Sequence, residues 1–212
     1  MDLELLISNE HKTLLKLFDA QLGVCSSLES WRSFIVWCFD CLENNHHRKE
    51  EEFIFSAVRP DPRIRAGGPL CTLYFDQQMI YSSLKLAQKT VKELTGQQLD
   101  PLWTEDLKAD QVSNSPLTIP GEDHEAGRIL LRGAEILIET EGQYPTLSQS
   151  ASAEGAKKQE ALRKLFSVYR DIQVSHFQRE ENCFLKMCKT LLTAERWQEI
   201  SARILASYKY LG

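Results

Sequence analysis

Several features that would place this chain in a special class are missing from its sequence. Its 212 residues include no apolar run that approaches the length of a membrane span. The first residues include Asp2 and Glu4, so they lack the basic start and apolar core of a secretory signal peptide. The formal net charge is only −5 at pH 7, which gives no electrostatic reason to expect nucleic acid or an anionic membrane as a partner. We therefore expect a cytoplasmic protein, with residues 1–212 forming one domain.

The cysteines are too few for a disulfide framework in a chain of this length. There are six, and they lie among hydrophobic residues, as buried thiols do in a reducing compartment. The spacing of Cys38 and Cys41 would also suit zinc, but no second pair matches it and both lie within a helical pattern. We favour packing over a metal or redox role for these two residues.

Strand-like alternation is scarce, whereas apolar residues recur at helical spacing along most of the chain. This pattern predicts five long helices, over residues 3–22, 30–58, 73–94, 121–141 and 156–192. A short final helix is expected to run from an N-cap at Thr193 to Tyr208. A proline-containing loop is expected over residues 95–121, and a mobile connection over residues 144–155. The sequence therefore predicts an all-α protein.

Histidine is also scarce, yet two of the five histidines open the same six-residue pattern in separate predicted helices. The two copies are His46-His47-Arg48-Lys49-Glu50-Glu51 and His176-Phe177-Gln178-Arg179-Glu180-Glu181. A His and a Glu four residues apart lie one turn apart on the same face of a helix. Two such pairs on facing helices would bring two imidazoles and two carboxylates to one buried position. Carboxylate-rich positions of that kind in helical bundles hold two metal ions, most often iron.

The apolar stripe of the second predicted helix separates its two tandem pairs. His46 and Glu50 lie on the stripe, which should face the interior. His47 and Glu51 continue instead toward a more polar side. We therefore interpret His47 as a residue that lies behind the ligands or on the surface, and expect His47→Ala to leave bound metal largely intact.

The same comparison places His176 and Glu180 on an apolar stripe, and His11 and His124 on the stripes of two further helices. A single histidine on such a face is usually a hydrogen-bonded core residue. An ionised carboxylate buried there needs a cation or strong hydrogen bonds. Four inward histidines and two inward glutamates from four helices favour a metal site.

The order of these landmarks resembles the hemerythrin-like family of cation-binding four-helix bundles. The landmarks are Asn9-Glu10-His11, Cys41 with the first His/Glu pattern, Gly67-Gly68-Pro69, Asp123-His124-Glu125-Ala126-Gly127-Arg128, and the second His/Glu pattern. The resemblance implies an up-down four-helix bundle holding two non-haem iron ions with an oxo or hydroxo bridge; manganese or zinc would suit the same donors. The ligands that it implies are His11, His46, Glu50, His124, His176 and Glu180.

This four-His, two-Glu set is similar to the bacterial branch that includes iron–sulfur repair and nitric-oxide-responsive proteins. The oxygen-carrying branch has a fifth imidazole one turn along its third helix, where this chain has Arg128. In bacterial relatives the Gly-Gly-Pro landmark is soon followed by the acidic-His motif, which here comes later, at Asp123-His124. We infer an inserted helix and loop over about residues 73–122, which either covers one mouth of the site or is a surface ornament.

The resemblance leaves several functions open. The pocket around such iron decides between reversible binding and turnover. Our leading hypothesis is a protein that binds or senses dioxygen or nitric oxide. Peroxide is a third small ligand. The alternatives are an oxidase or oxygenase acting on a small organic substrate, and a protein for iron storage, delivery or iron–sulfur repair. Tyr169, two turns before His176, is a candidate catalytic side chain, although packing is the more usual role at that spacing.

Overall fold

The computed structural model describes residues 2–65, 74–100, 105–106, 108–109, 115–139 and 153–208. In these residues every regular element is a helix, as the sequence predicted, and no strand occurs. The elements are α1 (Leu3–Val24), α2 (Leu28–Trp37), η1 (Cys38–His47), η2 (Glu50–Phe55), α3 (Ser56–Val58), α4 (Pro62–Arg65), α5 (Tyr74–Thr95), α7 (Thr118–Glu139), α8 (Ala153–Arg179), η4 (Glu180–Phe184), α9 (Leu185–Leu191) and α10 (Ala194–Tyr208).

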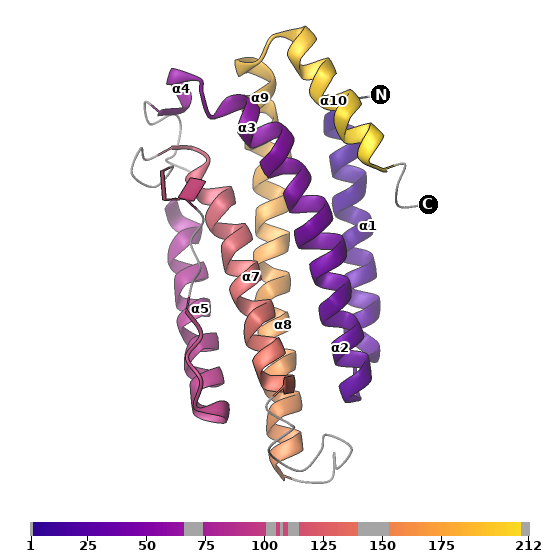
Figure 1. Ribbon diagram of the computed structural model, residues 1–212, viewed down its shortest axis with the longest axis vertical. Coiled ribbons are helices and arrows are strands. Elements are labelled where there is room, and N and C mark those ends of the chain that lie inside the picture. Colours follow the sequence, from indigo (N-terminus) through magenta and orange to yellow (C-terminus); the bar gives the residue numbers. More distant parts are fainter. Residues whose placement is uncertain are drawn as a thin grey trace.

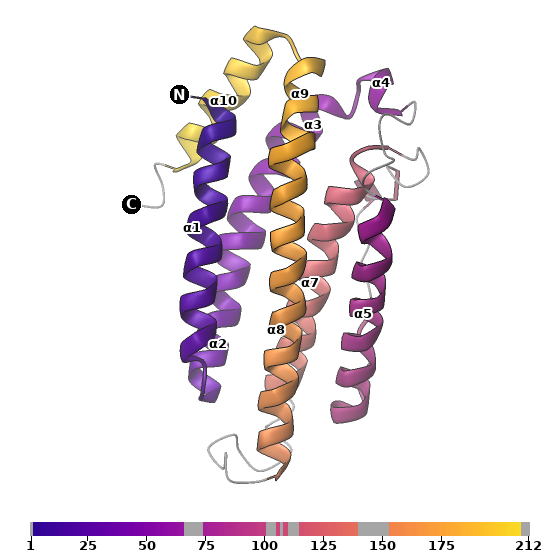
Figure 2. The ribbon, with the colours of Figure 1, turned by 180° about the vertical axis from the view of Figure 1, so that it is seen from behind.

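The long helical segments lie side by side (Figure 1). The segment from α2 to α3 is continuous, and so is the segment from α8 to α9. Followed along the chain, α1, α2–α3, α7 and α8–α9 run in alternating directions, and α1 and α7 each contact both α2 and α8 (Figures 1 and 2). Among these described helices, none is long and apolar enough to cross a bilayer.

The helix expected over residues 73–94 is present as α5, which packs against α7 and α8 on the side away from α1 (Figure 2). It ends at Gly96, whose φ of 72° suits a glycine after a helix. Leu84, Ala87 and Val91 of this helix belong to the same apolar cluster as residues of α7 and α8. The helix of this segment is therefore built into the core and is not a surface ornament.

Two expected loops are described only in part. Residues 144–152 of the expected mobile connection, like the Gly67-Gly68-Pro69 landmark, lie outside the described residues. The loop expected to last until residue 121 ends sooner, because α7 begins at Thr118. Pro120 lies in the first turn of α7, where no intrahelical hydrogen bond is lost.

The core consists of two apolar clusters with a polar layer between them. In α1, Ile7 belongs to one cluster and Leu14 to the other, with His11 between them. In α8–η4, Ile172 and Phe184 belong to different clusters in the same way and enclose the second His/Glu pattern. The helices thus place their ionisable side chains at one level of the structure.

Three stretches of these segments are π-helical: η1, η2 and η4. Regular α-helices were expected throughout. A π turn contains more residues than an α turn, and such turns occur frequently at functional sites. All three stretches lie at or beside the polar layer, so they change which side chains face it.

Candidate metal centre

The structure brings together the six residues that the sequence singled out. They come from α1, η1, η2, α7, α8 and η4, and each is at most 1% exposed. Their ligand atoms form two groups, in each of which all atoms lie within 4.8 Å of one another. The first group is His11, His46, Glu50 and Glu180, and the second is Glu50, His124, His176 and Glu180. The two glutamates are therefore common to two adjacent positions.

Each shared carboxylate directs its two oxygens to different histidine pairs. Oε1 of Glu50 lies 3.4 Å from Nε2 of His46, and Oε2 lies 3.5 Å from Nε2 of His124. Oε2 of Glu180 lies 3.4 Å from Nε2 of His11, and Oε1 lies 3.5 Å from Nε2 of His176. A carboxylate placed in this way could offer one oxygen to each of two metal ions.

The donor atoms are arranged to bind metal ions rather than to form hydrogen bonds with one another. Within the described part of the chain, neither oxygen of Glu50 or Glu180 has a hydrogen-bond partner, although all four are buried. Nε2 of His11 and of His46 lacks one as well. Ligand bonds of about 2.0–2.2 Å would place donors on one ion about 3–4 Å apart, which matches the separations above. Buried carboxylates without hydrogen bonds need a cation, so the residues fit a two-metal site.

A ring of outer carboxylates orients the histidines. Each of the five histidines has Nδ1 within 2.8–3.3 Å of a carboxylate oxygen. The pairs are His11–Glu181, His46–Glu10, His47–Glu43, His124–Glu51 and His176–Asp123. Such contacts fix the tautomer of a metal-bound imidazole and leave Nε2 as the donor. Sequence reasoning did not assign these roles, although Glu51 and Glu181, the second glutamates of the duplicated patterns, were a visible signal.

The electrostatics of the pocket favour positive charge. Burial raises the pKa of Glu50, but the surrounding histidines outweigh it and hold that pKa well below its usual value. Burial lowers the pKa of His11 and of His176, but Glu180 and Glu50, joined by Asp123 in the case of His176, reverse this effect and raise the two values to about 9 and about 10. Burial and the neighbouring His47 lower the pKa of His124 to about 4. The carboxylate of Glu50 therefore remains ionised and attracts cations.

His47 is not on the surface, so that part of our interpretation was wrong. Its side chain is fully buried and its ring stacks on His124 with centroids 4.0 Å apart. The wider turns of η1 explain the error, because they let adjacent residues both face the interior, as His46 and His47 do. In the regular α-helical register that was assumed, adjacent residues are about 100° apart around the axis, which placed His47 further from the apolar stripe than His46.

Tyr169 reaches the site indirectly. Its hydroxyl donates a 2.8 Å hydrogen bond to Oε1 of Glu43, whose other oxygen lies 2.9 Å from Nδ1 of His47. Its ring stacks on Phe18 in the larger apolar cluster. Tyr169 therefore both packs in the core and supports the carboxylate behind His47, but it is not a member of either ligand group.

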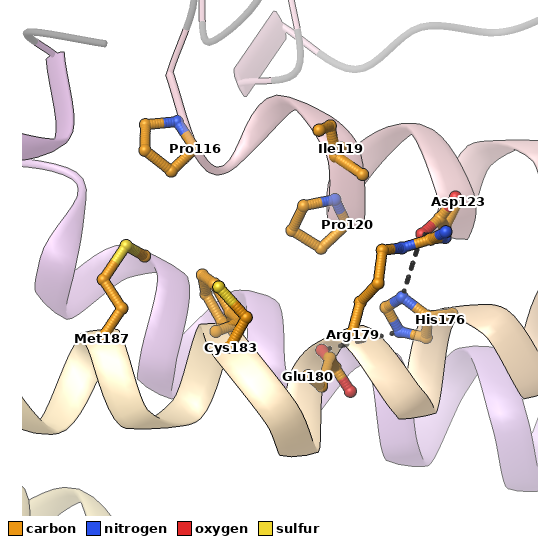
Figure 3. Close-up of a pocket in the computed structure, with 10 residues that line it drawn as sticks. Pro116, Ile119, Pro120, Asp123, His176, Arg179, Glu180, Cys183 and Met187 are labelled. Carbon is orange, nitrogen blue, oxygen red and sulfur yellow. Dashed lines mark hydrogen bonds and ion pairs between the residues drawn. The ribbon is translucent and has the colours of Figure 1, made fainter. Parts of the chain in front are cut away.

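A small cavity lies against one side of the centre (Figure 3). His176 and Glu180 line it beside the ion-paired Arg179 and Asp123, and an apolar wall completes it. The wall consists of Pro116, Ile119, Pro120, Cys183, Phe184 and Met187. The cavity volume is about 20 Å³, which accommodates one molecule about the size of water. Residues 116–120, just before and at the start of α7, thus contribute to the wall of this cavity.

In comparisons with known proteins, no family model, no curated protein and no solved structure matches this chain.

Proposed function

We propose that this chain is a hemerythrin-like, up-down four-helix bundle that holds two non-haem iron ions and binds or senses dioxygen or nitric oxide. The observation that carries the proposal is the position of Glu50 and Glu180, which each turn one oxygen toward each histidine pair. Imidazole and carboxylate donors suit iron, with manganese and zinc as competitors for the same atoms.

The number of donors supports a site that accepts an external ligand. In each group two imidazoles and two shared carboxylates face one position, which leaves a six-coordinate ion with room for solvent or a small molecule. Reduced iron in such surroundings supplies affinity for diatomic gases. The outer carboxylates keep the imidazoles in place while the ligand enters and leaves.

The cavity supports a small ligand over an organic substrate. It borders His176 and Glu180, its wall is mainly apolar, and its volume of about 20 Å³ matches a diatomic molecule. Typical pockets for organic ligands have volumes of about 300–1,000 Å³. An oxygenase would need a larger pocket at this position.

The proposal is tested by metal analysis and gas binding on the full chain. Purified protein, reconstituted anaerobically with ferrous iron, should hold two ions per chain and should change its optical spectrum when dioxygen or nitric oxide is added. Evacuation after dioxygen addition should restore the first spectrum. A Glu50→Gln variant should lose both ions, whereas Glu52→Gln, an exposed neighbour paired with Arg48, should keep them. A wild-type chain that binds no metal would overturn the proposal. Continuous oxygen consumption with an added organic reductant would favour an oxidase, and ready loss of iron to an apo acceptor would favour iron delivery.

A further inference from the structure

His47 is arranged as a ligand would be, although it lies outside the two groups described above. Its side chain is fully buried, and Oε2 of Glu43 holds its Nδ1 at 2.9 Å. The same contact between Nδ1 and a carboxylate is made by each of the four proposed histidine ligands. For those four, the contact sets Nε2 as the atom that faces the metal.

The position of His47 also suits a ligand. Its ligand atom lies within 4.8 Å of those of His124 and His176, so the three imidazoles form a third potential metal-binding group. The ring of His47 is edge-on to that of His176, with centroids 5.3 Å apart. Among the residues described, no such grouping connects His47 with His11, His46, Glu50 or Glu180. Of the two metal positions, His47 is therefore adjacent only to the one that His124 and His176 share.

The partner of Nε2 of His47 is one that a metal ion can replace. This atom lies 3.0 Å from Oε1 of Gln173, an uncharged amide one turn before His176. Nε2 of Gln173 is buried without a hydrogen-bond partner in the described structure, so the amide is not held from its other end. Gly127 lies against it, because an added Cβ there would be only 3.3 Å from the amide nitrogen and 3.0 Å from Oε1 of Glu43. The pocket around His47 is thus polar and closely packed, and one contact with the Gln173 amide holds Nε2 of His47.

Arg128 contacts two of the carboxylates that lie behind the histidines on this side of the site. Its guanidinium lies 2.6 Å from Oε1 of Glu51 and 3.5 Å from Oε2 of Glu43. These are the carboxylates that hold Nδ1 of His124 and of His47. Arg128 therefore holds in place the two carboxylates that contact the neighbouring imidazoles of His47 and His124.

We propose that His47 is a fifth imidazole ligand, completing the metal position formed by His124 and His176. This inference rests on the proposed two-metal centre and gives its two metal positions different numbers of imidazole ligands. One ion has two imidazoles, from His11 and His46, and the other has three. The tandem His46-His47 pair thus serves both ions, which the π-helical turns of η1 permit.

The test is Mössbauer spectroscopy and metal titration on the full chain loaded with ⁵⁷Fe. Wild-type protein should show two different iron environments of equal intensity. His47→Leu should weaken binding of one ion by about 100-fold or more, because loss of a supporting residue alone lowers metal affinity by about 10–100-fold. Exogenous imidazole added to a His47→Gly variant should restore the second environment.

Gln173→Leu is the matched control, because it removes the hydrogen bond to His47 and leaves the imidazole free to bind metal. If His47 is a ligand, the Gln173→Leu variant should retain both ions and both iron environments. If Gln173→Leu loses as much metal as His47→Leu, or if His47→Leu keeps both environments, His47 is a structural residue and the inference fails. A wild-type chain that holds two ions in one shared environment would also overturn it. A wild-type chain without metal would instead refute the proposed function.

Discussion

Nδ1 of His11 lies 2.8 Å from Oε1 of Glu181, a residue 170 positions later in the chain. The other oxygen of Glu181 accepts a 3.1 Å hydrogen bond from the Ser8 hydroxyl, one turn before His11. The carboxylate is therefore fixed between α1 and η4 and holds the imidazole with Nε2 toward Glu180. This contact orients a proposed ligand without being part of the ligand set.

Glu181→Leu should lower the metal affinity by about 10–100-fold, because the imidazole of His11 then loses its orienting partner and some of its basicity. The effect should be smaller than that of Glu180→Leu, which removes a shared carboxylate. Competition with a chromophoric chelator measures both. Equal metal affinities for Glu181→Leu and wild type would show that the contact between Glu181 and His11 does not support metal binding.

His176→Ala should reduce bound iron sharply, because its Nε2 faces oxygens of both Glu50 and Glu180. Metal analysis after gel filtration is the measurement, and Gln178→Ala in the same helix is the control. If His176→Ala retains both ions, His176 is not a ligand, and the group that contains it does not bind metal as proposed.

The helices and the six inward residues could be predicted because they depend on local spacing. An apolar stripe reports which face of a helix is buried, so His11 and Glu180 were correctly placed facing the interior. The stripe assumes a constant number of residues per turn, however, and η1 breaks that assumption. The alternative that placed His47 on the surface was therefore wrong, whereas its neighbour His46 was correctly placed facing the interior.

Of the five outer carboxylates, only Glu43 lies one helical turn from its histidine, so spacing could not predict the other four pairings. Glu181 and His11, like Asp123 and His176, are far apart in the sequence and meet only after the helices pack. Their pairing depends on helix rotation and axial offset, which the packing of the two apolar clusters sets. A sequence shows which carboxylates are available, but not which imidazole each one contacts.

Removal of metal should destabilise the protein. Without cations, the carboxylates of Glu50 and Glu180 are buried with no hydrogen bonds in the described structure, and only the neighbouring imidazoles offset their mutual repulsion. An ion at 100 times its dissociation constant stabilises the folded state by about 2.7 kcal/mol. Chelated protein should therefore melt at a lower temperature than the metal-loaded form in calorimetry. A chelated form that melts no lower would show that these carboxylates do not bind metal in the folded protein.

Metal binding should release protons at neutral pH. In the metal-free chain the pKa of His11 is raised to about 9 and that of His176 to about 10, because contacts with Glu180 and Glu50 outweigh burial. Both imidazoles are thus protonated at pH 7, and an ion must displace a proton from each. Affinity should therefore rise between pH 7 and pH 9, by up to about 100-fold per pH unit for two protons.

Zinc titration calorimetry in buffers of different ionisation enthalpy counts these protons without redox chemistry. A pH-independent affinity with no proton release would mean that His11 and His176 are neutral in the metal-free protein. That result would contradict the electrostatic balance between these imidazoles and the shared carboxylates.

Filling the cavity should slow ligand entry without removing the metals. Cys183 lines the cavity and is only partly buried, so Cys183→Phe adds bulk where the packing is not already complete. Stopped-flow mixing of the reduced, iron-loaded protein with nitric oxide should show association slowed by about tenfold. Cys41→Phe is the control, because Cys41 is also partly buried but does not line the cavity. Equal association rates in the two variants, with full iron content in both, would mean that ligands reach the centre by another route.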